Sequence, residues 1–228
     1  MGKIQAWQDE ANITGQTYAE KPFWYLNEET GQTYHDIFGC VGWPSEFSDK
    51  SEGAPGYVGV VGVVKMRGEG RDIKKAPFQL LAELESRDVQ TMVEGILELR
   101  RDYGFGTSPG LMQTFWGDPD RFIAQLALIN EGLTRIKGEK AAILVTPPLD
   151  FYEEKVFDSY VRSFRSVLVP DRVRFYFGKN EILKSRLGEF KGGDPAVFAV
   201  GGLVHTLLGG PIWMHHMRET MFVISDGI

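Results

Sequence analysis

Two aspartates stand where a carboxylate could take part in catalysis. Asp118 follows the strand-like residues 111–116 and precedes a helical pattern over 120–136. The carboxyl end of a strand is where open α/β sheets place their sites. Asp194 opens an apolar, helix-forming run over 194–208, with a proline directly after it. Both positions also suit a helix N-cap, for which Asp and a following Pro are favoured, so a capping role and a chemical role both stay open.

Basic residues form a second group with a chemical use. They concentrate in and after the third expected helix, whereas acidic residues dominate positions 1–56. A local basic face can follow a phosphate backbone even on an acidic protein, and a solvated helix face is the alternative. The residues concerned are Arg162, Arg165, Arg172, Arg174, Lys179, Lys184, Arg186 and Lys191.

The single cysteine and the histidines are expected to be structural. Cys40 lies in an apolar run with no evident catalytic partner and is predicted to belong to the core. His205 lies in the apolar helix and is also predicted to pack in the core. His215 and His216 are adjacent, and because side chains at i and i+1 of a helix diverge, they would make a poor metal pair.

The elements that must position these residues change character along the chain. A polar arm or hairpin is expected at 1–36, one main domain at 37–208 and a tail at 209–228. Three strands come first in the domain, and Glu83 and Glu85, at the end of the third, are expected at the surface. Strands then alternate with helices, which implies parallel pairing in the second half of a mixed α/β sheet. The expected strands are residues 37–43, 57–66, 78–84, 111–116 and 141–146, and the expected helices 89–103, 120–136, 152–168, 181–190 and 194–208.

This order, an antiparallel three-strand meander followed by helix–strand units and C-terminal helices, resembles the ribonuclease H-like fold. Within that superfamily it resembles the nuclease domain of phage terminase large subunits. No G-x-x-x-x-G-K-[ST] motif occurs, so the ATPase motor of that family is absent from this sequence. The resemblance rests on four segments. Residues 39–45 (GCVGWPS) are similar to the family's first strand, which carries a Gly-x-Asp-Pro-Ala-like motif, and residues 114–119 (TFWGDP) are similar to a fourth strand that ends in an acidic residue. Residues 157–177 are similar to the helix and return segment before the C-terminal helices, and residues 194–208 (DPAVFAVGGLVHTLL) are similar to the final helix.

The resemblance implies phosphodiester hydrolysis with two divalent ions about 3.5–4 Å apart, held by several carboxylates. Carboxylate and water ligands suit Mg²⁺ or Mn²⁺. Asp118 and Asp194 would then be the catalytic residues and metal ligands. The family's first-strand aspartate corresponds to Trp43, which cannot bind Mg²⁺, so Glu46 or Asp49 in the following loop would supply the missing ligand. Loop acids of this kind are more often simply solvated.

The composition is that of an ordinary globular protein and excludes several classes. Of the 228 residues, 43% are hydrophobic and 25% charged, which allows a sizeable core. The net charge of -6 argues against a protein whose main role is to coat nucleic acid. One cysteine excludes an intrachain disulfide, and no apolar run reaches the roughly 18 residues of a membrane helix. Because the N-terminus is polar and lacks a signal-peptide pattern, we expect a cytoplasmic location. The resemblance to a phage protein implies that this is the cytoplasm of a bacterial host cell.

Three functions are consistent with these patterns. The first is a terminase-nuclease-like phage or prophage protein that cleaves DNA with Mg²⁺ or Mn²⁺, and it requires the acids of residues 114–119 and 193–198 to lie side by side. The second is a catalytically degenerate protein of the same fold that binds DNA or protein in a phage packaging or assembly complex, which Trp43 favours. The third is a Rossmann-like small-molecule enzyme, in which the first three strands would be parallel.

Overall fold

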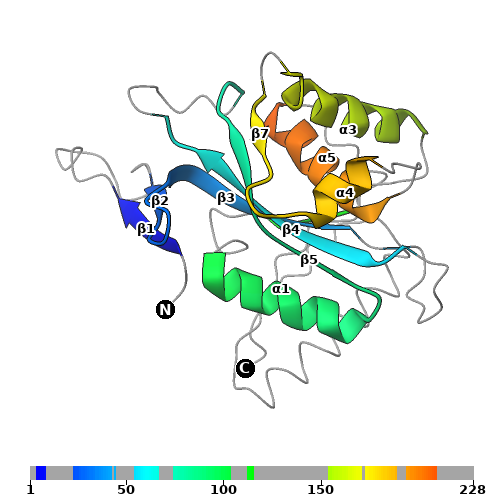
Figure 1. Cartoon of the computed structure of the whole chain (residues 1–228), viewed down its shortest axis with the longest axis horizontal. Helices are drawn as coiled ribbons and strands as arrows, with labels where there is room; N and C mark the ends of the chain where they lie inside the picture. Colours follow the sequence, from blue (N-terminus) through cyan, green and yellow to red (C-terminus); the bar gives the residue numbers. More distant parts are fainter. Residues whose placement is uncertain are drawn as a thin grey trace, which may run out of the picture.

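A mixed, mostly antiparallel β-sheet with helices on both faces forms the body of the protein (Figure 1). The computed structural model describes residues 4–8, 23–42, 44, 54–66, 74–103, 112–115, 154–170, 173–188 and 194–209. The strands within these ranges are β1 (Ile4–Gln8), β2 (Phe23–Asn27), β3 (Thr33–Gly42), β4 (Gly56–Val64), β5 (Phe78–Ser86), β6 (Met112–Phe115) and β7 (Phe175–Tyr176).

The sheet runs in the order β1-β2-β3-β4-β5-β7, and β6 pairs with β3 outside this path. Each of β1 to β5 is antiparallel to the next, whereas β6 is parallel to β3 and β7 is parallel to β5. The expected meander and the expected parallel pairing after it are therefore confirmed for the described strands. The parallel first half of a Rossmann-like enzyme is not what the chain forms.

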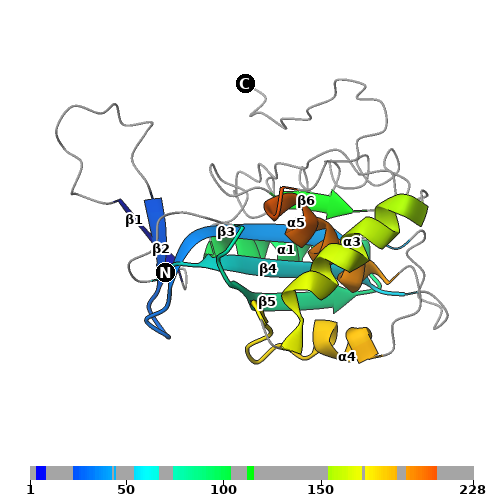
Figure 2. The same cartoon turned by 90° about the horizontal axis from the view of Figure 1, so that it is seen from above.

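Four helices of the described residues cover the sheet. α1 (Val89–Tyr103) packs on one face against β4 and β5, and α5 (Pro195–Leu207) packs on the other against β3, β4 and β6. α3 (Glu154–Val167) lies outside α5, and α4 (Ile182–Gly188) lies beside β5, at the opposite side of the sheet from β6 (Figure 2). The expected helix at 120–136 and the expected strand at 141–146 lie outside the described residues.

The core has two halves, one on each face of the valine-rich strand β4. Val58 and Val60 face α1, where Met92, Val93 and Ile96 are fully buried at helical spacing. Tyr57, Val61 and Val63 face α5, whose residues from Pro195 to His205 are all buried. The change of face between Val60 and Val61 coincides with a register shift against β5. Burial on both sides explains why β4 is almost uniformly apolar.

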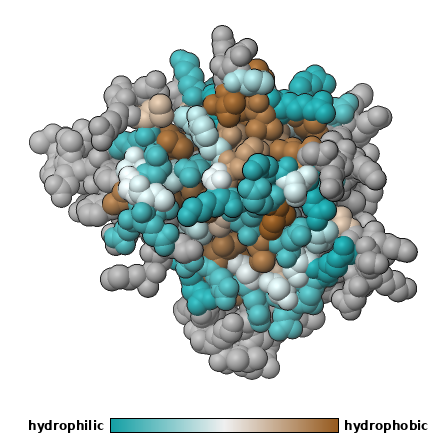
Figure 3. Space-filling model, in the orientation of Figure 1, coloured by the Kyte–Doolittle hydropathy of each residue, from teal (hydrophilic) through white to brown (hydrophobic). Residues whose placement is uncertain are grey.

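The outer surface combines a polar majority with a local apolar area. Hydrophobic residues gather in the upper centre of the face drawn in Figure 3, with hydrophilic residues around them. The large apolar residues that are exposed in the described part of the chain are Met66, Val169, Val173 and Tyr176. No helix among the described residues combines the length and the apolar character needed to cross a membrane.

Candidate functional site

One end of the sheet brings four strands and a helix start together. Gly42 at the end of β3 is paired with Phe115 at the end of β6 on one side and with Tyr57 of β4 on the other. Tyr57 is in turn paired with Glu85 of β5, so the four residues form one row across the sheet. α5 begins against this row, because a Cβ atom at Gly42 would overlap the carbonyl group of Pro195. The sequence therefore brings the residue preceding α5, Asp194, to this end of the sheet.

Asp194 is the N-cap of α5. Its backbone is extended (φ -70°, ψ 121°), and its Oδ1 atom accepts hydrogen bonds from the N–H groups of Ala196 at 2.9 Å and Val197 at 3.2 Å. Pro195 takes the first helical position, where no N–H is needed. The capping role expected from the sequence is confirmed. Since the cap uses Oδ1, Asp194 keeps Oδ2 as an oxygen that suits a cation ligand.

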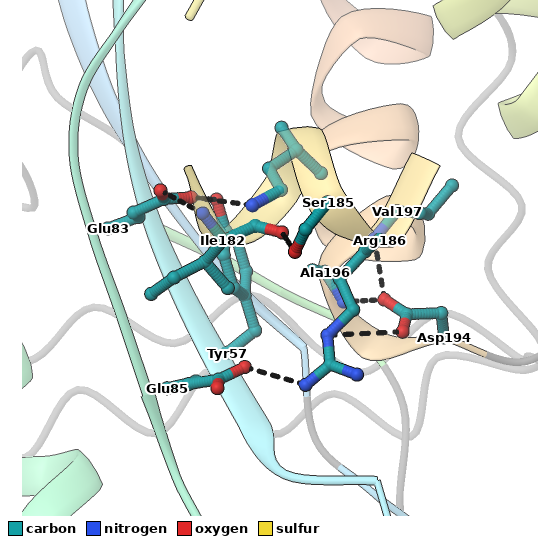
Figure 4. Close-up of polar contacts among 10 residues, drawn as sticks. Tyr57, Glu83, Glu85, Ile182, Ser185, Arg186, Asp194, Ala196 and Val197 are labelled. Carbon is teal, nitrogen blue, oxygen red and sulfur yellow. Dashed lines mark hydrogen bonds and ion pairs between the residues drawn. The ribbon is translucent and has the colours of Figure 1, made fainter. Parts of the chain in front are cut away.

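Arg186 of α4 lies between two carboxylates (Figure 4). Its Nη2 atom donates to Oε2 of Glu85 at 2.9 Å, and its Nε atom is 3.9 Å from Oδ2 of Asp194. The Arg186 side chain is 31% exposed and that of Asp194 is 15% exposed. These partly desolvated ion pairs connect the end of β5 to the start of α5.

Glu83 holds α4 against the sheet. Its Oε1 accepts a hydrogen bond from the N–H of Ile182 at 2.7 Å and its Oε2 accepts one from the N–H of Leu183 at 2.9 Å (Figure 4). A carboxylate at a helix N-terminus is favourable because it satisfies free N–H groups and faces the positive end of the helix dipole. Glu83, expected at the surface, is half-buried because of these contacts with α4. Glu85 is exposed as expected, but it is paired with Arg186.

Tyr57 adds a hydroxyl group to the same cluster. Its Oη donates to Oε2 of Glu83 at 3.2 Å. Burial raises the pKa of Tyr57 well above its usual value, and the neighbouring Cys40 and Glu83 raise it further. The hydroxyl group therefore stays protonated at neutral pH and serves as a donor rather than as a base.

Most of the predicted metal ligands lie outside the described residues. These are Asp118, Glu46 and Asp49. Trp43, which stands at the position of the family's first-strand aspartate, is also outside the described residues. Among the residues that the structure does describe, no group of three His, Cys, Asp or Glu side chains is arranged to hold a metal ion. Asp194 is thus the predicted ligand whose surroundings are known.

The predicted nucleic-acid-binding residues differ in their surroundings. Arg162 and Arg165 are exposed on α3. Arg174 donates through Nη1 to the backbone carbonyl of Lys74, and Lys184 pairs with Glu181 one helical turn away at 3.0 Å. Arg172 lies outside the described residues. Arg162 and Arg165, like the exposed Lys179, are available to a phosphate.

His205 and Cys40 are core residues, as predicted. His205 is buried, its Nδ1 lies 2.8 Å from Oγ of Ser163, and its ring packs against Tyr160. Cys40 is fully buried with Sγ 3.5 Å from the carbonyl oxygen of Gly59, and burial raises the pKa of its thiol.

No protein-family model and no curated protein matches this chain. The contacts at this end of the sheet add Glu83, Glu85 and Arg186 to the site. The sequence indicates that Glu83 and Glu85 belong together, because residues two apart on a strand point to the same face of the sheet. No local sequence pattern connects these two acids with Arg186.

Proposed function

We propose that this chain is a ribonuclease H-like protein related to the nuclease domain of phage terminase large subunits, and that it cleaves DNA with Mg²⁺ or Mn²⁺. The observation that carries the proposal is the order of the described elements. An antiparallel meander, β3-β4-β5, is followed by α1 and then by β6, which is parallel to β3 and next to it. This is the strand order that the sequence resemblance implies for the first four strands of such a domain.

The position of Asp194 supports a site at the shared end of β3 and β6. Pro195 contacts Gly42, Gly42 is paired with Phe115, and Phe115 precedes Asp118 by three residues. Three residues span at most about 11 Å even when extended. The backbone therefore allows Asp118 and Asp194 to share a metal ion at this end of the sheet.

Within the proposed site, each described residue has a defined task. The N–H groups of Ala196 and Val197 fix the orientation of the Asp194 carboxylate, which leaves Oδ2 for a cation. Divalent ions bound by Asp118, Asp194 and Glu46 or Asp49 would stabilise the attacking and leaving oxygens of phosphodiester hydrolysis. Arg162 and Arg165 would contact phosphates of the DNA.

A catalytically degenerate protein of the same fold is the second candidate. Two observations favour it: Trp43 stands where the family has its first-strand aspartate, and the Oδ2 atom of Asp194 faces Arg186 at 3.9 Å. Such a protein would bind DNA or another protein of a phage packaging or assembly complex without cleaving a strand.

Nicking of supercoiled plasmid DNA in the presence of Mn²⁺ tests the first candidate against the second. We expect the wild-type chain to nick the plasmid, and Asp118→Asn and Asp194→Asn to reduce the rate at least tenfold. Asn is as good an N-cap as Asp, so Asp194→Asn removes the charge without removing the cap. Glu98→Gln, an exposed change on α1 at the other face of the sheet, is the matched control and should nick at the wild-type rate. A wild-type chain that neither nicks DNA nor binds Mn²⁺ would exclude the nuclease and leave the second candidate.

A further inference from the structure

Exposed apolar side chains gather around β7, the last strand in the order of the described sheet. Of the four large apolar residues that are exposed in the described part of the chain, three lie between positions 169 and 176, namely Val169, Val173 and Tyr176. Each keeps between 41% and 49% of its surface exposed. Figure 3 shows hydrophobic residues in its upper centre, where Figure 1 draws β7. Single exposed apolar residues are ordinary, whereas a group of them indicates a contact surface.

Hydrogen bonds fix the segment that carries these side chains. The N–H of Arg174 donates to the carbonyl oxygen of Val167 at 2.8 Å, which holds the start of β7 against the end of α3. The Tyr176 hydroxyl donates to the carbonyl oxygen of Val173 at 3.3 Å, so its ring lies along the same connection. Phe175, between them, is buried in the core. These contacts bring the exposed side chains of the connection into one surface.

Positive charge borders the apolar residues. The described residues at 74–77, 168–170 and 173–179 include no acid, and they include the cations Lys74, Lys75, Arg174 and Lys179. Arg174 donates through Nη1 to the carbonyl group of Lys74, which joins the segment before β5 to the one before β7. Over the longer stretches 65–77 and 165–179 the sequence has nine Lys or Arg and three Asp or Glu. The surface is therefore basic on a protein whose net charge is -6.

The composition of this surface favours a protein partner over a nucleic acid. Protein contact surfaces have an apolar and aromatic centre within a polar rim, and Tyr and Arg are enriched in them. Val169, Val173 and Tyr176 supply such a centre, and the cations supply the rim. Binding of a single nucleic-acid strand depends instead on several aromatic rings that stack with bases. Because potentials across an interface are complementary, the partner that fits this rim is acidic.

We propose that the surface formed by Val169, Val173 and Tyr176, with its border of cations, binds a protein segment whose apolar side chains are flanked by Asp and Glu. The apolar contacts supply affinity, and the cations select an acidic segment and speed its approach. The inference goes beyond the proposed function, since it needs neither DNA cleavage nor a metal ion.

Selection from a displayed library of random peptides on the full chain tests this inference. The enriched peptides should carry Leu, Ile or Phe flanked by Asp or Glu, and a labelled synthetic copy of the most enriched one should bind in fluorescence anisotropy. Val173→Ser and Tyr176→Ser should each weaken its binding about tenfold, as expected for the loss of one apolar contact. Lys179→Gln, which removes one exposed cation, should weaken it about threefold.

Two matched controls should bind the peptide like wild type. Met66→Ser removes a similarly exposed apolar side chain beside β4, which is two strands away from β7. Arg101→Gln removes an exposed cation at α1. Thermal melting identifies any variant that fails to fold, and if Val173→Ser is one of them, Tyr176→Ser and Lys179→Gln decide.

Three results would overturn the inference. The first is a set of enriched peptides without an excess of acids, or a peptide that binds the Ser variants as tightly as wild type. The second is binding of labelled oligothymidylate that the same variants lose, which would make a nucleic acid the partner. The third is a wild-type dimer in sedimentation velocity that the Ser variants convert to monomer, which would make a second copy of the chain the occupant.

Discussion

Two tyrosines on neighbouring strands direct their hydroxyl groups to side chains of β5. Tyr34 donates to Oε1 of Gln79 at 3.0 Å, and Tyr57 donates to Oε2 of Glu83 at 3.2 Å. Both rings are buried in the core, so burial raises the pKa of each phenol, that of Tyr34 to about 12. The strands are thus connected by side-chain hydrogen bonds whose donors persist only while the phenols stay protonated.

The raised pKa of Tyr34 predicts a loss of stability in alkaline solution. Unfolded tyrosine ionises near pH 10, so between pH 10 and about 12 the unfolded chain binds fewer protons than the folded chain, and stability falls as the pH rises. At pH 11 the difference between the folded and unfolded pKa of Tyr34 lowers the free energy of unfolding by about 1 kcal/mol. Urea unfolding at pH 8 to 11 should show this fall, and Tyr34→Phe should make it shallower. Tyr176→Phe, at an exposed ring, should keep the wild-type slope; equal slopes in all three proteins would contradict the assignment.

At the scale of elements, two glycines allow helices to approach the sheet closely. A side chain at Gly42 would meet the backbone of Pro195, where α5 begins. A side chain at Gly95 of α1 would meet the Cδ2 atom of Leu84 on β5. The first obstacle is the main chain of a helix start and the second is the end of a flexible side chain, so the two contacts differ in how readily they can yield.

This difference predicts opposite tolerance to alanine. Gly42→Ala should lower the free energy of unfolding by about 1–3 kcal/mol, because the start of α5 must move away from β3. Gly95→Ala should stay within about 1 kcal/mol of wild type, because Leu84 can rotate and alanine is the better helix former. Chemical denaturation of both variants is the measurement. A Gly42→Ala protein as stable as wild type would show that the contact between β3 and α5 is looser than described.

Elements with a strong local pattern could be predicted from the sequence. The valine run of β4 and the helical spacing of α1 reflect burial, and the cap at Asp194 follows from the Asp-Pro pair before an apolar run. β1 is not predicted, because five residues are too few to distinguish a strand from a polar arm. The contacts of Arg186 are also not predicted, since Glu85 precedes it by 101 residues and only the tertiary fold joins them.

At the scale of the whole molecule, the local charge on the α3 side of the sheet is opposite in sign to the net charge of the protein. The chain carries a net charge of -6, yet the outermost helix of the α5 side, α3, presents Arg162 and Arg165 to solvent. The face covered by α1 lies on the other side of the sheet (Figure 1). If the proposed function holds, DNA approaches the α3 side, and its attraction depends on a few local cations rather than on the total charge.

The salt dependence of DNA binding measures how many such cations take part. Replacing Arg162 and Arg165 by Gln together should weaken binding and reduce the slope of log K against log salt by about 1.8, which is about 0.9 for each phosphate that is no longer neutralised. The double change Arg87→Gln with Arg101→Gln removes the same charge near α1 and should leave the slope unchanged. Equal slopes for the two double variants would show that DNA binding depends on the net charge of the protein alone.

One edge of β3 serves two partners. β2 pairs with Thr33 and Tyr34 at its beginning, and β6 pairs with the four residues that end it. Removing the residues before Thr33 would therefore leave the main-chain N–H and C=O groups at the beginning of β3 without the pairing that β2 provides. Such an uncovered margin is a template on which the strand of a second molecule can add, so we expect a chain that lacks β1 and β2 to self-associate more readily than the full chain.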